Sequence, residues 1–376
     1  MPWEEKTVME KRKEFIERAA ECSNFSELCR EYGISRKTGY KWLQRFQEAA
    51  SLEDQSRRPK KPYRKTKPAI EEAILEVRRE NPAWGGKTIR AVLEMNGISG
   101  LPSAKTCSNI LKRNGCVSEE ESIKRKPCKR FERKRCNSLW QTDFKGDFLL
   151  LDGSRCYPLD ILDDHSRFCI RTEPKSAATG VLESFKQAFE EYGLPDAVLS
   201  DNGSQFAGFR GGYTKFERWL MDLDILPIHG RILHPQTQGK IERFHRTMKA
   251  ELLQAPLRDL EEATAKFATW RWKYNEIRPH SALGMKPPAS VYVPSERKLF
   301  EPKAYEYDSG HVRMVNNWGY LRFGPISLYL SETMANTYVE IVSADDDAFS
   351  IRYRNFQIAL VDANEKILIN RHIKKL

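Results

Sequence analysis

The stretch Leu139-Trp140-Gln141-Thr142-Asp143-Phe144 predicts a β-strand, and it begins the part of the chain that decides the fold. Seven further elements are predicted after it: strands over 155–162, 168–172, 197–200 and 225–228, and helices over 181–192, 216–223 and 240–253. Three consecutive strands followed by alternating helices and strands indicate an α/β core built on a mixed sheet.

Three carboxylates occupy unusual positions in this pattern. Asp143 is a charged residue inside a strand, Asp201 follows a short apolar strand, and Glu242 begins a helix after a polar loop. Open α/β sheets place ligand sites where strands end and helices begin. Three acids that converge there repel one another unless a hard cation neutralises them. Mg²⁺ suits such a site, because it is held by a few carboxylates and completes its shell with substrate phosphates.

Each of the three acids also has an ordinary interpretation. Asp143 can pair with Lys145, and the run Asp201-Asn202-Gly203 is by itself a turn signal. A solvated acid such as Glu242 is favourable in the first turn of any helix. The prediction of a metal site therefore depends on the three contexts occurring together.

Five motifs carry a family resemblance: Trp140-Gln141-Thr142-Asp143, LDILDDHSR over 159–167, SDNGSQF over 200–206, HPQTQGKIERFHR over 234–246 and YNEIRPHSALG over 274–284. They resemble the integrase catalytic core of DDE transposases from bacterial insertion sequences, and the segment 29–46 resembles the helix-turn-helix of that group. The resemblance implies an RNase H-like fold with Asp143, Asp201 and Glu242 as the catalytic, metal-binding triad. It implies two Mg²⁺ ions, with Mn²⁺ as a substitute. It also implies cleavage of DNA at the ends of the element and joining of the 3′ ends to target DNA.

The spacing of the last two acids departs slightly from the retroviral type of core. Forty residues separate Asp201 from Glu242, a few more than that type has. The glycine-rich stretch 207–214 predicts a loop that takes up the difference. Glu217 is a competing third acid, but it lacks the Gly-Lys-Ile-Glu-Arg context, so Glu242 is preferred.

Two helical modules with the layout of a helix-turn-helix precede the core. The first has helices predicted over 9–21, 25–32 and 36–47, and the second over 69–80, 88–95 and 104–113. In the helix over 36–47, Ser35 is the predicted cap, and Tyr40, Leu43 and Phe46 form the predicted apolar face. The polar positions on the last helix of each module are predicted to contact DNA: Arg36, Lys37, Thr38 and Lys41 in the first, and Lys105, Asn109 and Lys112 in the second. An ordinary three-helix bundle with a polar surface is the alternative.

The basic charge of the chain is concentrated in two segments. The whole chain carries +11, residues 51–68 carry +5 and residues 123–135 carry +7. Both segments contain proline and little apolar periodicity, so they are predicted to be linkers that follow a phosphate backbone; solvated spacers are the alternative. Predicted DNA contacts in them are Arg57, Arg58, Lys60, Lys61, Arg125, Lys126, Lys129 and Arg130. Beside the acids, the predicted DNA contacts are Gln238, Lys240, His245, Arg246 and Lys249.

Residues beyond 300 predict short strands with frequent turns, which favours a small antiparallel, SH3-like β-barrel. The predicted organisation is multidomain: a helix-turn-helix domain 1–50, a basic linker 51–68, a second helix-turn-helix-like domain 69–117, a basic linker 118–136, an RNase H-like core 137–290 and a β-barrel 300–376.

Composition limits the cellular setting. No apolar run approaches the roughly 18 residues of a membrane span, and the eight cysteines form no CxxC pair. We expect a cytoplasmic, nucleoid-associated bacterial protein with reduced thiols and no membrane partner.

The predicted function is that of a DNA transposase that binds terminal inverted repeats. Its partners are then double-stranded DNA, both transposon ends and target, and its own copies, since synapsis of two ends requires a homodimer or higher. Two other classes remain open at this stage: a non-catalytic DNA-binding regulator that keeps the core as a scaffold, and a structure-selective nuclease.

Overall fold

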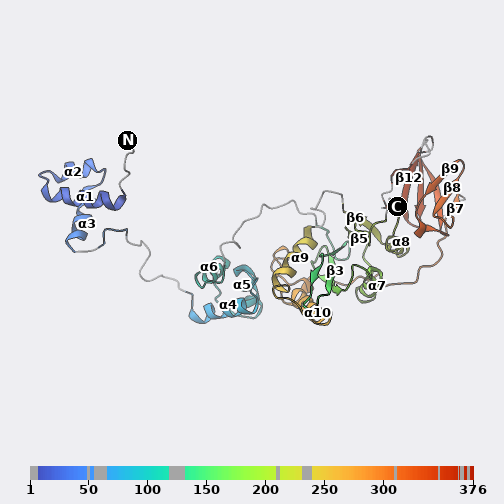
Figure 1. Cartoon of the computed structure of the whole chain (residues 1–376), viewed down its shortest axis with the longest axis horizontal. Coiled ribbons are helices and arrows are strands. Elements are labelled where there is room, and N and C mark those ends of the chain that lie inside the picture. The colour runs from blue at the N-terminus through green and yellow to red at the C-terminus, as the bar shows by residue number, and fades with distance from the viewer. Residues whose placement is uncertain are drawn as a thin grey trace. The chain divides into compact units, whose positions relative to one another are not determined.

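The computed structural model describes residues 7–48, 51–54, 66–117, 132–208, 212–230, 239–308, 311–345, 348–362, 364, 368–370 and 373–376. The chain divides into two units, Met1–Thr66 and Lys67–Leu376. The first unit holds three helices, and the second holds three more helices, an α/β core and an all-β region (Figure 1).

The first unit is built from α1 Val8–Glu21, α2 Phe25–Glu31 and α3 Arg36–Gln47. Each helix begins at a polar residue whose side chain accepts a hydrogen bond from a backbone N–H three residues on, and these caps are Thr7, Asn24 and Ser35. Gly33 has φ +65°, so it makes the turn between α2 and α3 that a residue with a side chain rarely adopts. The capping of the third helix by Ser35 is confirmed.

The predicted apolar face of α3 is wrong in two of its three residues. Tyr40 and Phe46 are 53% and 58% exposed, whereas Gly39 and Trp42 are buried. Gly39 lies so close to α1 and α2 that a Cβ there would be 2.8 Å from Cys29 Sγ and 2.9 Å from Phe25 Cζ. The prediction failed because it weighed the size of apolar side chains, while the helices approach closely at the residue that has none.

The second helical module contains α4 Pro68–Glu80, α5 Gly86–Met95 and α6 Ala104–Arg113. Its core includes Ile74, Trp84, Ile89 and Ile110. A Cβ on Gly86 would lie 2.5 Å from the backbone nitrogen of Ser108, so the start of α5 packs against α6 at a distance that requires glycine.

The core is a mixed sheet of β1 Trp140–Phe144, β2 Phe148–Leu149, β3 Arg155–Asp163, β4 Cys169–Lys175, β5 Ala197–Ser200 and β6 Leu226–His229. β3 pairs antiparallel with β1, β2 and β4, while β5 pairs parallel with β1 and β6. The prediction of a mixed sheet is confirmed. Because β1 and β5 are parallel neighbours, their carboxyl ends meet at one edge of the sheet.

Helices cover both faces of this sheet, and they are α7 Val181–Tyr192, α8 Lys215–Asp222, α9 Gly239–Glu251 and α10 Leu260–Glu276. Successive residues of a strand point to opposite faces. Ile161 of β3 packs into the core formed with α7 and α8, and Leu162 packs into the core formed with α9 and α10. α9 therefore lies on the face opposite to α7.

After α10 come the short 3₁₀ helices η4 Ser281–Leu283 and η5 Pro288–Ser290, and then the C-terminal region. That region contains β7 Val312–Met314, β8 Tyr320–Phe323, β9 Ile326–Tyr329, η6 Glu332–Met334, β10 Tyr338–Asp345, β11 Ala348–Tyr353, β12 Phe356–Asp362, β13 Leu368–Asn370 and β14 Lys374–Lys375. β7 and β10 to β14 form one antiparallel sheet, and β8 and β9 form a separate hairpin. Both pack on one apolar core, so the all-β character of this region is confirmed.

The C-terminal region packs on the helix that lies between Asp201 and Glu242 in sequence. Tyr213 and Met221 are members of its apolar core, and the Tyr213 hydroxyl donates to the carbonyl of Ile358. Asp222 at the end of α8 accepts hydrogen bonds from the Tyr353 hydroxyl at 2.6 Å and from Arg354 Nε at 2.8 Å. The stretch 207–214, predicted to be only a loop, thus contributes a buried aromatic ring.

Candidate active site

Asp143 lies on β1 directly opposite Asp160 on β3 in the antiparallel register. Directly opposed side chains lie on the same face of a sheet. Asp160 is fully buried at 0% exposure, so a second carboxylate that the sequence did not single out stands beside the predicted catalytic one.

His245 of α9 connects these two acids. Its Nε2 lies 2.9 Å from Asp160 Oδ2, and its Nδ1 lies 3.9 Å from Asp143 Oδ2. The 2.9 Å contact is at ion-pair distance without the alignment of a hydrogen bond, since neither Asp160 oxygen has a hydrogen-bond partner. His245 is predicted to contact DNA, and in the structure both of its ring nitrogens face carboxylates.

The electrostatics of Asp143 show a site with excess negative charge. Burial raises the pKa of Asp143, His245 lowers it, and the carboxylates of Asp201 and Asp160 raise it; the net pKa is about 7. Asp143 and Asp201 are therefore close enough to repel each other. A cation placed between such acids favours their ionised forms.

Asp201 follows β5 and begins the turn that the sequence predicted. Its Oδ1 accepts a hydrogen bond from the backbone N–H of Gly203 at 3.0 Å, and a Cβ on Gly203 would lie 3.0 Å from that same oxygen. The side chain of Asn202 donates to the carbonyl of Gly230 at 2.9 Å, which ties the turn to the end of β6. The turn geometry therefore fixes where the Asp201 carboxylate lies.

Glu217, the competing third acid, has a different set of partners. It is 3% exposed and completes a capping box with Thr214 at the start of α8. Its Oε1 lies 2.8 Å from His229 Nε2, and His229 Nδ1 lies 3.2 Å from Ser200 Oγ and 3.4 Å from the carbonyl of Asp201. Burial lowers the pKa of His229, but the hydrogen bond to Glu217, the negative charge of Glu217 and the interactions with Asp201 together outweigh burial, so the net pKa is raised. Glu217 thus supports the backbone of Asp201 through His229.

Glu242 lies in the first turn of α9 with an exposed side chain. In the part of the chain that the structure describes, no three His, Cys, Asp or Glu side chains are grouped so that they could hold a metal ion. Glu242 nevertheless precedes His245 by three residues, and residues so spaced on a helix are neighbours about 5–6 Å apart at Cβ. The contact of His245 with Asp143 thus directs this face of α9 towards the predicted site.

The other predicted DNA contacts near the acids differ in their surroundings. Lys240 Nζ lies 2.5 Å from Oδ2 of the fully buried Asp164, so it anchors the start of α9 to the turn after β3. Arg246 and Lys249 are exposed. Gln238 lies outside the described residues.

In the helical modules, the predicted DNA contacts Arg36, Lys37, Lys41, Lys105, Asn109 and Lys112 are exposed. Thr38 is partly buried, and its hydroxyl is 2.9 Å from that of the cap Ser35. Lys41 Nζ stands 4.6 Å from the ring centroid of Trp42. Eight predicted contacts lie outside the described residues: Arg57, Arg58, Lys60, Lys61, Arg125, Lys126, Lys129 and Arg130.

Two of the five sequence motifs, those over 159–167 and 274–284, contain polar residues that stabilise the core through buried hydrogen bonds and an ion pair. In the motif over 159–167, Asp163 accepts from the backbone N–H groups of Asn137 and Ser166, and the buried Arg167 pairs with Glu132. In the motif over 274–284, the buried Asn275 side chain bonds both the N–H and the carbonyl of Cys169, at 2.8 and 3.0 Å. These polar residues fasten the turn after β3 and the helix α10 to the sheet.

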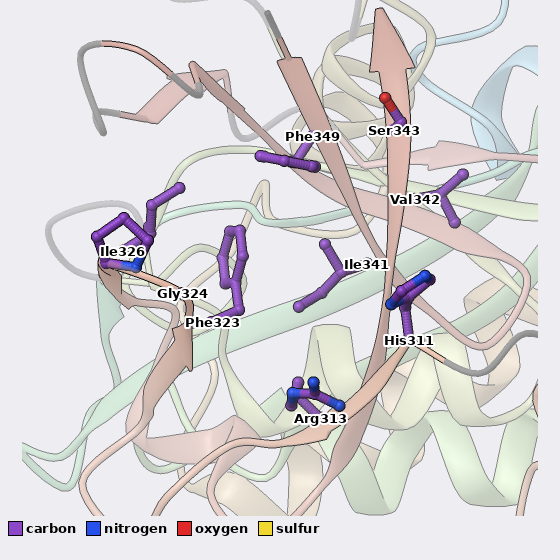
Figure 2. Close-up of a pocket in the computed structure, with 10 residues that line it drawn as sticks. His311, Arg313, Phe323, Gly324, Ile326, Ile341, Val342, Ser343 and Phe349 are labelled. Atoms are coloured by element: carbon purple, nitrogen blue, oxygen red, sulfur yellow. The ribbon is translucent and has the colours of Figure 1, made fainter. Parts of the chain in front are cut away.

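A hollow of about 510 Å³ lies elsewhere, in the C-terminal region. Figure 2 shows Phe323 and Phe349 on one side and Ile341 across from them, with Arg313 and His311 at the edge of the group. None of the three predicted catalytic acids lines it.

Family models match the chain in both of its units. Two models described as integrase core domain match residues 133–235 and 223–288. A helix-turn-helix domain model matches 11–60, and a homeodomain-like domain model matches 38–111, across the boundary between the units. Residues 133–288 are thus similar to integrase core domains, and residues 11–111 are similar to helix-turn-helix and homeodomain-like domains.

Proteins of bacterial insertion elements are similar to parts of the chain. A 39.2 kDa protein of insertion element IS476 from Xanthomonas euvesicatoria is 31% identical over 156 residues, which are 41% of this chain and 43% of that protein. A 31.7 kDa protein of IS407 from Burkholderia multivorans is 23% identical over 62% of this chain and 84% of its own length. The transposase InsD of insertion element IS2 from Escherichia coli is 27% identical over 57% and 75%. The chain thus spans less than half of the first of these relatives and most of the other two.

Solved structures of retroviral integrases are also similar to the chain. The HTLV-2 integrase catalytic core in complex with magnesium is 17% identical with a TM-score of 0.33, over 42% of this chain and 97% of that one. The intasome of simian T-cell lymphotropic virus in complex with a PP2A regulatory subunit is 17% identical with a TM-score of 0.38, over 72% and 95%.

No helix in the described ranges combines the length and the apolar character needed to cross a membrane.

Proposed function

We propose that the chain is a DNA transposase that cleaves the ends of its element and joins them to target DNA, with Asp143, Asp201 and Glu242 as the catalytic acids. The observation that carries this proposal is the charge at the edge of the sheet. The Asp143 carboxylate is partly buried and is repelled by the carboxylates of Asp201 and Asp160, and its pKa is about 7. Such a site gains stability when a cation binds, because the cation removes the repulsion.

The donor chemistry of these residues fits Mg²⁺, with Mn²⁺ as a substitute. Carboxylate oxygens are the ligands that Mg²⁺ takes from proteins in phosphoryl-transfer sites. Asp143 and Asp201 supply two of them, and Glu242, one turn before His245 on α9, is proposed as the third. Two bound ions would stabilise the charge on the attacking and leaving oxygens.

The proposed reaction is two successive phosphoryl transfers without a protein nucleophile. A water oxygen attacks the phosphorus at the end of the element, and the bond to the 3′ oxygen breaks, so that the strand is left with a 3′-hydroxyl. That hydroxyl then attacks a phosphorus of the target DNA, a new phosphodiester bond forms, and a target 3′-hydroxyl is released. The protein holds its acids on the ends of β1 and β5 and on α9. Arg246 and Lys249 on α9 are exposed, and they are proposed to position DNA phosphates.

DNA recognition is assigned to the two helical modules and the basic segments beside them. The exposed basic residues on α3 and α6 are proposed to contact the terminal repeats, as the last helix of a helix-turn-helix does. The segments 51–68 and 123–135 add sequence-independent affinity through phosphates. Because two ends react together, the active complex is proposed to be a homodimer or larger.

A strand-transfer assay with Mg²⁺ and DNA that carries the element ends tests this function. We expect joined products from the natural chain. From Asp201→Asn we expect none, with unchanged binding to the end DNA, because that change removes a metal ligand far along the chain from the DNA-reading helices. The matched control is Asp196→Asn, an acid in the turn before β5 that pairs with Arg135; it should leave joining intact.

The outcomes also separate the two other classes of protein. Binding to end DNA without cleavage by the natural chain would identify a regulator. Cleavage without joining, and without preference for the element ends, would identify a nuclease. Full activity of Asp201→Asn would falsify the role proposed for this carboxylate.

A further inference from the structure

Asp160 is a buried acid that the proposed reaction does not use. It is fully buried on β3, and both of its carboxylate oxygens lack hydrogen-bond partners. Leaving a carboxylate buried without hydrogen bonds is costly, so such a group in a native fold calls for a reason. The imidazole of His245 lies beside it, with Nε2 2.9 Å from Asp160 Oδ2.

The same imidazole faces the predicted metal ligand with its other nitrogen. His245 Nδ1 lies 3.9 Å from Asp143 Oδ2. Asp143 and Asp160 are directly opposed across β1 and β3, and like charges in that position destabilise a sheet. The imidazole therefore stands between two carboxylates that would otherwise repel each other.

We propose that Asp160 and His245 are a positioning pair that sets the orientation of the Asp143 carboxylate for its metal ion. This rests on the proposed function, since it takes Asp143 as a metal ligand. In this proposal, the Asp160 carboxylate fixes the orientation of the imidazole ring through Nε2, and the ring fixes the Asp143 carboxylate through Nδ1. Carboxylates that bind metals are themselves held by outer partners, and loss of such a partner typically weakens metal affinity by about 10- to 100-fold.

The surroundings of His245 favour this role over a direct contact with DNA. Its side chain is 13% exposed, and both nitrogens face acids. A phosphate contact needs an N–H directed to solvent. The exposed neighbours Arg246 and Lys249 offer that, and His245 does not.

The pair is tested by Mn²⁺ binding to the full-length chain without DNA, measured by the loss of the free-ion signal in electron paramagnetic resonance. We expect Asp160→Asn and His245→Gln each to bind Mn²⁺ about 10- to 100-fold more weakly. The double variant should bind no more weakly than His245→Gln alone, because Asp160 acts through the histidine. His245→Gln changes a side chain at the edge of the site, so it keeps the test informative should the change at the buried Asp160 prevent folding.

A matched control separates positioning from general stability. Glu173 on β4 is an acid of the same sheet that accepts a hydrogen bond from Ser184 Oγ at 2.6 Å and pairs with Arg171 and Lys175. Glu173→Gln should lower the melting temperature and leave Mn²⁺ affinity unchanged.

Three results would contradict the proposed positioning role of Asp160 and His245. One is unchanged Mn²⁺ affinity in both single variants. Another is additive losses in the double variant, which would mean that the two residues act independently. The third is a loss of DNA affinity in His245→Gln, without any loss of Mn²⁺ affinity, which would make the histidine a DNA contact. Failure of the proposed function is distinct: Asp143→Asn would then retain strand transfer whatever the pair does.

Discussion

Asp143 and Asp201, at the edge of the sheet, each lie beside a histidine that also contacts a buried acid. His245 lies between Asp143 and Asp160, and His229 lies between the carbonyl of Asp201 and the carboxylate of Glu217. Removing one partner of a buried charged pair leaves the other uncompensated, which is strongly destabilising. These contacts therefore hold the two aspartates in place, while the carboxylates proposed as catalytic remain available to a cation.

The sequence could predict Asp143 and Asp201 because each stands at a marked point of a strand. It did not identify Asp160, which is one of three acids within the run LDILDD, and nothing local distinguishes it. Its role depends on the register of β1 with β3 and on a histidine 85 positions later in the chain. The contact between Asp160 and His245 depends on how distant elements pack together, and a local sequence pattern carries no information about that packing.

The two candidates for the third acid can be separated by comparing stability with activity. Glu217→Gln removes the negative charge beside His229 and leaves one oxygen where two are in use, Oε2 towards Thr214 and Oε1 towards His229. We therefore expect a loss of about 1–3 kcal/mol in the free energy of unfolding. Glu242→Gln changes an exposed side chain, so its effect on stability should stay within about 0.5 kcal/mol, while strand transfer is lost. Urea unfolding and the strand-transfer assay measure the two quantities on the same preparations. Loss of all activity in Glu217→Gln at natural stability would make Glu217 the third acid instead.

At the scale of elements, the sequence pattern predicted the strands correctly but did not show which face of α3 packs against the neighbouring helices. The strands of the core and of the C-terminal region were predictable, because alternation of apolar residues reports burial of one face. In α3, however, the inner face is centred on Gly39, and the large side chains of Tyr40 and Phe46 are exposed. Periodicity locates a helix, but it does not show which of several apolar stripes meets the neighbouring helices.

Gly39→Ala tests whether this close approach holds the first unit together. The added Cβ would stand 2.8 Å from Cys29 Sγ and 2.9 Å from Phe25 Cζ, and overpacking of this kind typically costs about 1–3 kcal/mol. Alanine gains about 1 kcal/mol of helix propensity, so we expect a small net loss. Hydrogen exchange of the full chain, followed by mass spectrometry, should show faster exchange in residues 8–47.

The control for this change is Tyr40→Ala at the adjacent, 53% exposed position. It removes the ring that lies 4.5 Å from that of Phe25 but forces no contact, so residues 8–47 should keep more protection than in Gly39→Ala. Equal or better protection in Gly39→Ala than in the natural chain would show that α3 has room to move away.

At the scale of the whole molecule, α8 joins the core to the C-terminal region. Phe216 and Leu220 of this helix pack into the core of the sheet, while Met221 packs into the β region. The sequence did not predict this joint, because it forms between residues about 130 positions apart, such as Asp222 and Tyr353. The same helix follows the Asp201 turn, so the C-terminal region supports the segment between the second and third proposed catalytic acids.

Asp222→Ala tests that support. The change leaves the Tyr353 hydroxyl and Arg354 Nε without their shared acceptor, and loss of a hydrogen bond to a charged group costs about 1.5–3 kcal/mol. We expect hydrogen exchange to rise in α8, β11 and β12 but not in α4–α6, and strand transfer to fall because the Asp201 turn loses a rigid neighbour. The control Glu340→Gln removes a charge that pairs with Arg352 at 3.7 Å within the β region itself, and it should leave exchange in α8 and strand transfer unchanged. If Asp222→Ala speeds exchange in β11 and β12 while α8 and strand transfer keep their natural values, the C-terminal region is attached to the core without supporting its active site.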